Sequence, residues 1–333
     1  MFLAADIGGT KTLIALGDQG GIRYQKRILN DEHPGAEALI GAFLREAAAA
    51  GLPAAFDGAC LALAGPVEPG IGRARLTNRD WEIDAGQLAR TLPLGPLTLI
   101  NDFAASAAGV ATLDAEETRI LQAGEPRPGS PRLVLGPGTG LGVAAWLPGE
   151  TEAGRILTSE AGHIGFAPAN REQRELLDHL AKNYGRVTVE RIVSGSGLVL
   201  CHQFCIGGNP ACTLTPAEIS RRALAGDDPP SRHALDLFLA VFGAFAGDMA
   251  LSFLARGGVF LAGGIVPKIL PRLVDGPFLG AFNDKAEYAA LAAAIPIVAV
   301  LSEDLALRGA LATARHRAGA SGSATEHAGG IVK

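Results

Sequence analysis

A glycine-rich turn between two apolar runs occurs twice in this chain, first in residues 2–16 and again in residues 133–146. In both copies the run after the turn is another β-type segment and not a helix, so each copy is predicted to be a β-hairpin. Glycines let the backbone come so close to a polyphosphate that amide N–H groups face its oxygens. Two such hairpins predict an α/β chain with two related lobes that clamp one nucleotide from both sides.

Each hairpin taken alone also fits an ordinary tight turn. Neither copy is a P-loop, because no Gly-Lys-Ser/Thr follows the glycines, and no glycine set has the dinucleotide spacing G-x-G-x-x-G. Asp6, beside the first glycine pair, could orient a hydrated magnesium ion. A third pair, Gly263 and Gly264, ends an apolar run and is predicted to form the floor of an adenosine site.

Composition excludes some classes of function. The chain has 333 residues, of which 48% are hydrophobic and 19% charged, so it can bury a large core and is expected to form two domains. Its net charge of −5 is spread along the sequence and offers no basic stripe for nucleic acid. Phosphate is therefore expected to be bound locally, by backbone amides and a metal ion.

The first residues lack the charged and apolar regions of a secretory signal. The most apolar long segment, residues 235–255, contains Asp236 and Asp248 and is crowded with Gly and Ala, which favours a buried core helix over a membrane span. A cytoplasmic protein without membrane contact is expected.

Four cysteines fit a reducing compartment, where unpaired buried thiols are common. His202, Cys205 and Cys212 are close enough in sequence to suggest zinc, but their spacing matches no standard zinc motif. Buried thiols are the favoured interpretation, and no metal held tightly by the protein alone is expected.

Local sequence patterns predict the remaining helices and strands. Helical periodicity is expected in residues 35–50, 104–112 and 304–317, and buried strands in residues 59–64, 97–100 and 298–301. The small and polar segment 319–333 is predicted to be a disordered tail.

Asp102 follows the strand at 97–100 directly, at the end where α/β proteins usually bind ligands. A carboxylate there can act as a general base toward a hydroxyl. The alternative is that it caps the helix that follows, and the two readings are close to even. Asn101 and Asp102 side by side can contact two hydroxyls of a polyol.

Glu160 and His163 flank small residues, so both can face the hydroxyls of one ligand. No serine or cysteine nucleophile lies in an elbow motif, so hydrolase chemistry is poorly supported. Glu190 is a third candidate carboxylate, with a surface ion pair to an arginine such as Arg186 as its alternative.

Together these motifs resemble the bacterial glucokinases, which belong to the superfamily of sugar kinases and actin. The resemblance covers residues 2–314, nearly the whole chain. The matching motifs, in chain order, are Asp6-Ile7-Gly8-Gly9-Thr10, Ala64-Gly65-Pro66, Leu76-Thr77-Asn78, Asn101-Asp102-Phe103, Gly138-Thr139-Gly140-Leu141-Gly142, Glu160-Ala161-Gly162-His163, Glu190-Arg191, Ser194-Gly195-Ser196-Gly197-Leu198 and Ala262-Gly263-Gly264-Ile265-Val266-Pro267.

The resemblance implies a two-lobed ribonuclease H-like fold of the actin and hexokinase type, with a central cleft that closes over sugar and ATP. It implies a small α/β domain from residues 1–112 plus 303–318 and a large α/β domain from residues 113–302. A homodimer is expected by the same analogy.

The resemblance also implies phosphorylation of glucose at its 6-hydroxyl, with ATP and Mg²⁺ and with Asp102 as the catalytic base. The sugar-binding positions it implies are Asn78, Asn101, Asp102, Glu160, His163 and Glu190. The nucleotide-binding positions are Asp6, Ile7, Gly8, Gly9, Thr10, Lys11, Gly138, Thr139, Gly140, Gly263 and Gly264.

Two positions depart from the pattern of this group: Lys11 replaces a common Asn, and Ala161 replaces the usual Gly. Gly-Gly-Thr-Lys is similar to a related branch of sugar kinases and repressors, but that branch holds zinc on a cysteine cluster where this chain has Phe166-Ala167-Pro168. A kinase for another hexose or amino sugar, or a sensor without catalysis, is the alternative. An ATPase without a sugar site fits less well, as does a repressor, because five residues before Asp6 leave no room for a DNA-binding helix-turn-helix.

Overall fold

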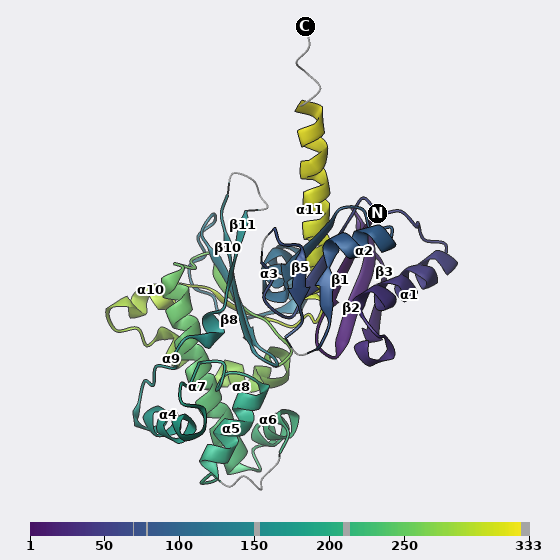
Figure 1. Cartoon of the computed structure of the whole chain (residues 1–333). Coiled ribbons are helices and arrows are strands. Elements are labelled where there is room, and N and C mark those ends of the chain that lie inside the picture. The colour runs from purple at the N-terminus through teal and green to yellow at the C-terminus, as the bar shows by residue number, and fades with distance from the viewer. Residues whose placement is uncertain (69, 78, 150–153, 209–213, 328–333) are drawn as a thin grey trace. The chain divides into compact units, whose positions relative to one another are not determined.

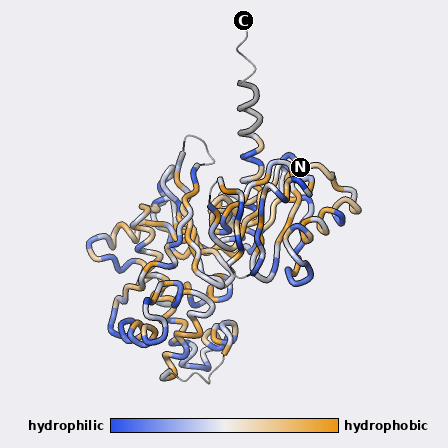
Figure 2. Tube along the Cα trace, viewed as in Figure 1, coloured by the Kyte–Doolittle hydropathy of each residue, from blue (hydrophilic) through white to orange (hydrophobic). Residues whose placement is uncertain are grey.

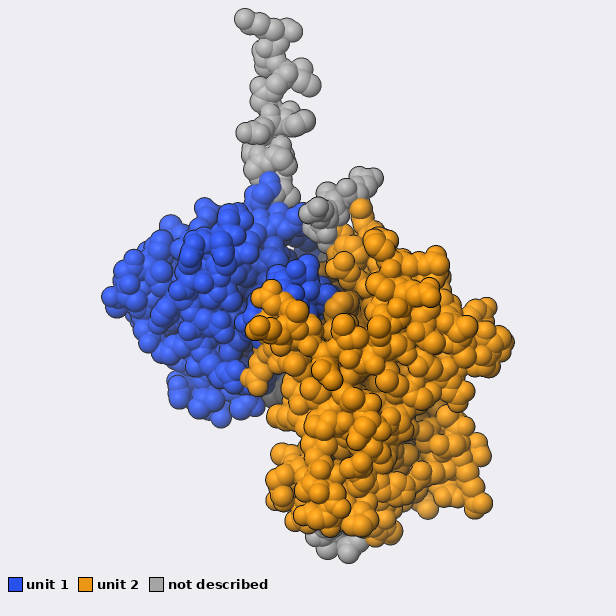
Figure 3. Space-filling view, turned by 180° about the vertical axis from the view of Figure 1, so that it is seen from behind, with its two compact units in different colours: residues 1–113, 304–333 blue, residues 114–303 orange. Residues whose placement is uncertain are grey.

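The computed structural model describes residues 1–68, 70–77, 79–149, 154–208 and 214–327, with side chains as far as residue 319. The chain divides into two compact units (Figure 3). The first unit comprises Met1–Leu113 with Asp304–Lys333, and the second comprises Asp114–Glu303. The domain boundaries expected from the sequence, at 112/113 and 302/303, lie next to these divisions.

The first unit contains a five-stranded sheet with the order β3-β2-β1-β4-β7. Its strands are β1 (Phe2–Ile7), β2 (Lys11–Asp18), β3 (Gly21–Leu29), β4 (Gly58–Leu63) and β7 (Leu97–Asn101). Strands β1, β2 and β3 are joined antiparallel, which confirms the first predicted hairpin, whereas β4 and β7 run parallel to β1. The carboxyl ends of β1, β4 and β7 therefore meet at one edge of the sheet.

Helices cover both faces of this sheet (Figure 1). Side chains alternate along β1, so Leu3 and Ile7 pack with Phe43 of α1 (Ala36–Ala49), while Ala4 packs with Leu311 of α11 (Leu305–His327). The other elements of the unit are η1 (Asn30–Glu32), β5 (Arg73–Arg75), β6 (Glu82–Asp84), α2 (Ala85–Thr91), α3 (Asp102–Gly109) and η2 (Val110–Thr112).

The last helix of the chain is longer than the sequence pattern indicates. Residues 304–317 were expected to be helical and residues 319–333 to be a disordered tail, but α11 continues to His327. The added residues 319–327 mix alanine, which has the highest helix propensity, with glycine and serine, which have lower helix propensity. Residues 328–333 lie outside the described residues.

The second unit repeats the strand order of the first. Its sheet has the order β11-β10-β9-β12-β13-β8. An antiparallel set, β9 (Arg132–Pro137), β10 (Leu141–Leu147) and β11 (Arg155–Ser159), is followed by the parallel strands β12 (Gly258–Leu261) and β13 (Ile297–Val300). Strand β8 (Thr118–Gln122) adds an antiparallel edge. This arrangement confirms the second predicted hairpin. The two units share one strand order, as expected for related lobes.

The long helix α7 (Pro229–Ser252) is the core of the second unit. It is long and apolar enough to span a membrane by length and composition, but most of its apolar window is buried in the protein. Its Phe238 and Phe242 form an aromatic cluster with Phe278 and Phe282, and all four side chains are fully buried. The prediction of a buried core helix in the segment 235–255 is therefore confirmed, although the helix begins at Pro229 and ends at Ser252.

Shorter helices surround α7 and the sheet. The helix α4 (Arg171–Tyr184) is hydrophilic over most of its length (Figure 2) and buries Leu176 and Leu180 on its inner face. The remaining elements are α5 (Gly195–Cys205), α6 (Pro216–Ala225), α8 (Leu270–Asp275), α9 (Phe278–Asn283), α10 (Ala289–Ala293) and the 3-10 turns η3 (Ala115–Glu117), η4 (Ala161–His163), η5 (Val266–Ile269) and η6 (Ala286–Tyr288).

Candidate functional site

Two side chains that were not predicted from the sequence donate hydrogen bonds to carbonyls of the first glycine turn. Asn30 Nδ2 donates to the carbonyl of Gly8 at 2.8 Å, and Arg79 Nη1 donates to the carbonyl of Gly9 at 3.1 Å. The Gly8 N–H closes the turn on the carbonyl of Lys11 at 3.1 Å. No sequence motif marks these contacts, because Asn30, in η1, and Arg79, in the loop after β5, are far from the turn in the sequence.

Asp6 is the last residue but one of β1, just before this turn. Burial raises the pKa of its carboxyl to about 6, although the positive charge of Lys11 opposes the shift. Because this raised pKa lies above that of an unfolded chain, the folded protein binds more protons than the unfolded chain between pH 3.8 and about 6. The ionised Asp6 therefore costs stability at neutral pH.

Replacing Asp6 with asparagine is expected to stabilise the fold and weaken activity. At pH 7.5 the free energy of unfolding should rise by about 2 kcal/mol, since each pKa unit corresponds to about 1.4 kcal/mol and part of the shift is screened. The gain should shrink toward pH 4, where the native carboxyl is protonated as well. Urea unfolding at both pH values measures it, and Asp18→Asn is the control, because hydrogen bonds from Arg23 and Gly20 lower the pKa of Asp18. A destabilised Asp6→Asn variant at pH 7.5 would contradict this account.

Asn101, and not Asp102, caps the helix α3. The Asn101 Oδ1 accepts the N–H groups of Phe103 at 2.9 Å and Ala104 at 3.2 Å. Its Nδ2 donates to the carbonyl of Gly65 at 3.1 Å and to Asp102 Oδ1 at 3.0 Å. The sequence left open that Asp102 caps this helix, but the cap is Asn101. The residue before the first helical residue is the one whose side chain can reach the N–H groups of the first turn.

Asp102 is the first residue of α3, and its carboxylate is oriented by two donors. Its Oδ1 accepts from Asn101 Nδ2 and, at 2.9 Å, from the Phe103 N–H. The strand register places Ile7 opposite Leu63 and Leu63 opposite Asn101. The sequence-predicted residues Asp6, Gly65, Asn101 and Asp102 therefore gather at one edge of the first unit's sheet.

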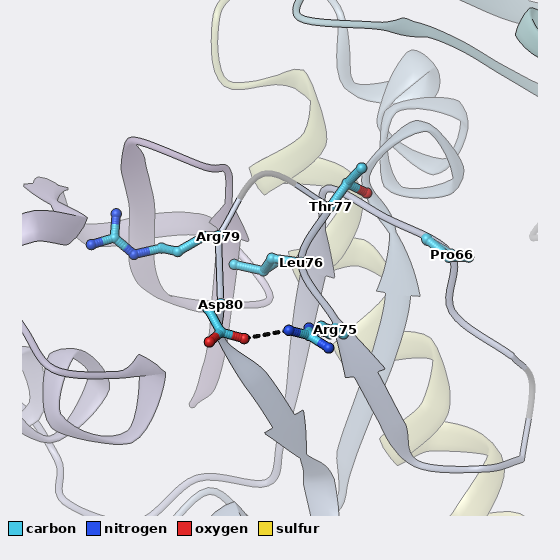
Figure 4. Close-up of a pocket in the computed structure, with 6 residues that line it drawn as sticks. All are labelled: Pro66, Arg75, Leu76, Thr77, Arg79 and Asp80. Atoms are coloured by element: carbon cyan, nitrogen blue, oxygen red, sulfur yellow. Dashed lines mark hydrogen bonds and ion pairs between the residues drawn. The ribbon is translucent and has the colours of Figure 1, made fainter.

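A cavity of about 630 Å³ lies in the first unit (Figure 4). Arg75 and Asp80, which form an ion pair at 2.5 Å, lie on one side of it, and Arg79 extends away from that pair. Among the described residues, those that line it are Pro66, Arg75, Leu76, Thr77, Arg79 and Asp80. The predicted sugar residue Asn78 lies outside the described residues.

Glu190, in the second unit, links two of the predicted motifs. Its Oε2 accepts the N–H of Leu141 at 2.8 Å, and its Oε1 lies 3.8 Å from His163 Nδ1. A Cβ at Gly140 would lie 2.5 Å from Glu190 Oε2, so the glycine leaves room for this carboxylate. Among the described residues Glu190 therefore contacts the glycine hairpin and the imidazole, and it forms no ion pair with Arg186.

Glu160 precedes the 3-10 turn η4 and His163 is its last residue, and both are exposed. The His163 N–H donates to the Glu160 carbonyl at 3.0 Å, and the Glu190 N–H donates to the Gly162 carbonyl at 2.9 Å. A Cβ at Gly162 would lie 2.3 Å from the carbonyl oxygen of Leu141. The structure therefore brings Glu160, His163 and Glu190 together around the start of β10.

The second glycine turn packs on two other predicted motifs. The Gly138 N–H donates to Gly140 at 2.8 Å, and the Gly138 carbonyl accepts the N–H of Gly195, the first residue of α5, at 2.9 Å. Gly263 has a left-handed φ of +92°, and a Cβ there would lie 2.7 Å from the Pro137 carbonyl. A Cβ at Gly264 would meet nothing within 4 Å. The hairpin and the predicted adenosine motif are thus neighbours with open space beside them.

The structure does not support a zinc site in the part of the chain that it describes. Among the described residues, no group of three or more His, Cys, Asp or Glu side chains is arranged to hold a metal ion. Cys201 and His202 are buried in α5, and burial raises the pKa of the Cys201 thiol and lowers that of the His202 imidazole. Cys212 lies outside the described residues.

These observations define a class of protein. Two units share one strand order, each presents a glycine hairpin, and polar side chains gather beside each hairpin. This is the architecture of the two-lobed sugar kinases of the actin and hexokinase type.

The chain belongs to the glucokinase family, whose family model matches residues 3–317. A glucokinase of the Synechocystis strain PCC 6803 is 36% identical, over 93% of this chain and 96% of the relative. The crystal structure of a glucokinase from an Antarctic psychrotroph is 30% identical with a TM-score of 0.82, over 95% of this chain and 98% of that one. A Streptomyces griseus glucokinase of the ROK family, solved with glucose and AMPPNP, is 21% identical with a TM-score of 0.65, over 95% and 99% of the two chains, and shares the fold.

Proposed function

We propose that this protein is a glucokinase that transfers the γ-phosphoryl group of ATP to the 6-hydroxyl of D-glucose and releases glucose 6-phosphate and ADP. The observation that carries the proposal is the oriented Asp102 carboxylate at the end of β7, in a chain that the glucokinase family model matches from residue 3 to residue 317. The Streptomyces griseus relative with glucose and AMPPNP supports the same pair of substrates.

In this proposal Asp102 is the general base. It accepts the proton of the glucose 6-hydroxyl as that oxygen attacks the γ-phosphorus in line, and ADP leaves from the opposite side. The Phe103 N–H and the Asn101 amide donate to one oxygen of the Asp102 carboxylate and so orient this group. Transfer is direct and needs no covalent enzyme intermediate.

The sugar is assigned to a set of hydrogen-bonding side chains. The proposed residues are Asn78, Asn101, Asp102, Glu160, His163 and Glu190. The hydrogen bond from Leu141 fixes the Glu190 carboxylate near His163, which favours a shared ligand for these two side chains. Sugar hydroxyls are both donors and acceptors, so a set of carboxylates, amides and an imidazole suits them.

The nucleotide is assigned to the glycine segments. The proposed set is Asp6, Ile7, Gly8, Gly9, Thr10, Lys11, Gly138, Thr139, Gly140, Gly263 and Gly264. The open space beside Gly264 leaves room for a ligand. We propose that Mg²⁺ enters the site together with ATP. Bound Mg²⁺ would neutralise charge on the phosphate oxygens, with Asp6 near it through water.

We further propose that the protein acts in the cytoplasm as a homodimer and supplies glucose 6-phosphate to glycolysis. The free cysteines Cys60 and Cys201, both buried, suit a reducing compartment. The homodimer rests on analogy with the family, and size-exclusion chromatography with light scattering would measure it.

The proposed function predicts ADP release that depends on both sugar and metal. With magnesium ATP, turnover is expected with glucose and not without sugar, and EDTA should abolish it until excess Mg²⁺ is added. Mannose, fructose and N-acetylglucosamine are tested in parallel, because Ala161 stands beside Glu160 where the family usually has glycine. Turnover that ignores sugar would instead indicate an ATPase. Turnover confined to another sugar would indicate a different sugar kinase, and none with any sugar would indicate a sensor.

A further inference from the structure

Arg79 connects three parts of the first unit. It lies in the loop between β5 and β6, and its side chain is 19% exposed. Its Nη1 donates to the Gly9 carbonyl at 3.1 Å, and its Nη2 donates to Asp31 Oδ1 at 2.7 Å. The guanidinium carbon lies 4.6 Å from the centroid of the Trp81 ring. Asp31 and Trp81 therefore fix the position of the Arg79 guanidinium, which binds the glycine turn.

Asn30 supports the same turn from a fully buried position. Its Oδ1 accepts from Thr12 Oγ1 at 2.7 Å, and its backbone N–H donates to the Thr10 carbonyl at 2.9 Å. With both of these contacts made, its Nδ2 is directed at Gly8. The carbonyls of Gly8 and Gly9 are thus both bonded to side chains from the body of the unit.

These two carbonyl contacts determine where the next two N–H groups point. In a planar trans peptide the C=O and the N–H of the following residue point in opposite directions. The N–H groups of Gly9 and Thr10 therefore face away from Asn30 and Arg79, and neither has a hydrogen-bond partner among the described residues. Consecutive N–H groups that face one side form a site for an anion.

We propose that Arg79 is a positioning residue for the nucleotide: by holding the Gly9 carbonyl back, it keeps the Gly9 and Thr10 N–H groups turned toward a phosphate of ATP. This inference rests on the proposed function for the identity of the anion. Without the guanidinium the Gly9–Thr10 peptide can rotate, because glycine has few backbone restrictions. Arg79 thereby acts on the nucleotide through the turn and has no role in binding glucose.

The test is the Arg79→Met variant, which keeps an apolar side chain over Trp81 and removes the guanidinium. We expect KM for ATP to rise about tenfold, consistent with the loss of one hydrogen bond from a charged donor. The KM for glucose should stay within about twofold, and the melting temperature within a few degrees. Arg79→Lys, which retains the charge and one of the two contacts, should give an intermediate KM for ATP.

Arg75→Met is the matched control. Arg75 lines the same cavity, but its side chain is 72% exposed and pairs with Asp80, so its loss removes one positive charge without touching Gly9. The control should leave KM for ATP unchanged. An equal rise in KM for ATP in both variants would overturn the proposal in favour of a general effect of charge. An unchanged KM for ATP in Arg79→Met would also overturn it. Parallel increases in both KM values with a lowered melting temperature would overturn it in favour of a structural role.

Direct binding of AMPPNP, measured by calorimetry, separates this inference from the proposed function. If the unsubstituted chain phosphorylates no sugar, the proposed function fails, but AMPPNP affinity in Arg79→Lys and Arg75→Met still decides the role of Arg79. The same measurement replaces the assay if Arg79→Met does not fold. Equal AMPPNP affinity in the Lys variant and the control would overturn the inference.

Discussion

An Asp102→Asn variant is expected to lose about 10³-fold in kcat while it keeps its fold, because a positioned general base contributes about 10² to 10⁴ in rate. The asparagine Oδ1 can still accept the hydrogen bonds that Asn101 Nδ2 and the Phe103 N–H donate to Asp102. The start of α3 should therefore be undisturbed, and the dissociation constant for glucose should change by less than about fivefold. Coupled ADP release measures kcat, and calorimetry measures glucose binding.

A charge-matched control separates catalysis from general electrostatics. Glu46→Gln removes one carboxylate from the same unit, where Glu46 is 50% exposed and paired with Lys26 at 2.6 Å. Exposed pairs contribute about 0 to 1 kcal/mol, so this variant should keep its turnover and nearly all of its stability. Near-normal turnover in Asp102→Asn would refute the assignment of the base. A variant that no longer binds glucose would show that Asp102 mainly binds the sugar.

Gly309→Ala is expected to cause the largest loss of stability, about 3 kcal/mol, which is at the upper end for overpacking. A Cβ at Gly309 would lie 1.7 Å from the carbonyl oxygen of Ala105 and 2.7 Å from the Gly109 N. Backbone atoms of α3 cannot rotate away as a side chain can, so α11 and α3 must separate. Because α3 begins at Asp102, kcat should fall as well. Urea unfolding and the ADP assay measure both effects.

Gly319 provides the control on the same helix. A Cβ there would meet nothing within 4 Å. Since alanine is favoured over glycine in a helix by about 1 kcal/mol, Gly319→Ala should leave stability unchanged or raise it slightly. Equal effects of the two substitutions would show that helix propensity, and not the contact with α3, governs this part of the chain.

Much of the fold could be predicted because its signals are local. Both hairpins, the buried helix α7 and the strand that ends at Asn101 follow from apolar periodicity and glycine positions among neighbouring residues. The length of α11 was predicted less well, because the small polar residues after 318 suit a coil and a helix alike. Composition alone therefore does not decide whether these residues form a coil or a helix.

The candidate site was predicted in part. The sequence indicated Asn101 and Asp102 as a pair, but it could not tell which of them caps α3. The structure assigns the cap to Asn101, since its Oδ1 accepts two N–H groups of the first turn. For Glu190 the sequence left a surface ion pair to Arg186 as an alternative, and its hydrogen bond with the Leu141 N–H was not predictable.

The sequence by itself determined the two glycine hairpins, the buried core helix and the end of the strand that carries the candidate base. Only the tertiary structure decided what holds those segments in place: Arg79 reaches Gly9 across 70 residues, and Glu190 reaches Leu141 across 49. The physical reason is that turn chemistry and periodicity act between near neighbours, whereas a contact between distant residues forms only once strand pairing and core packing have brought their loops together.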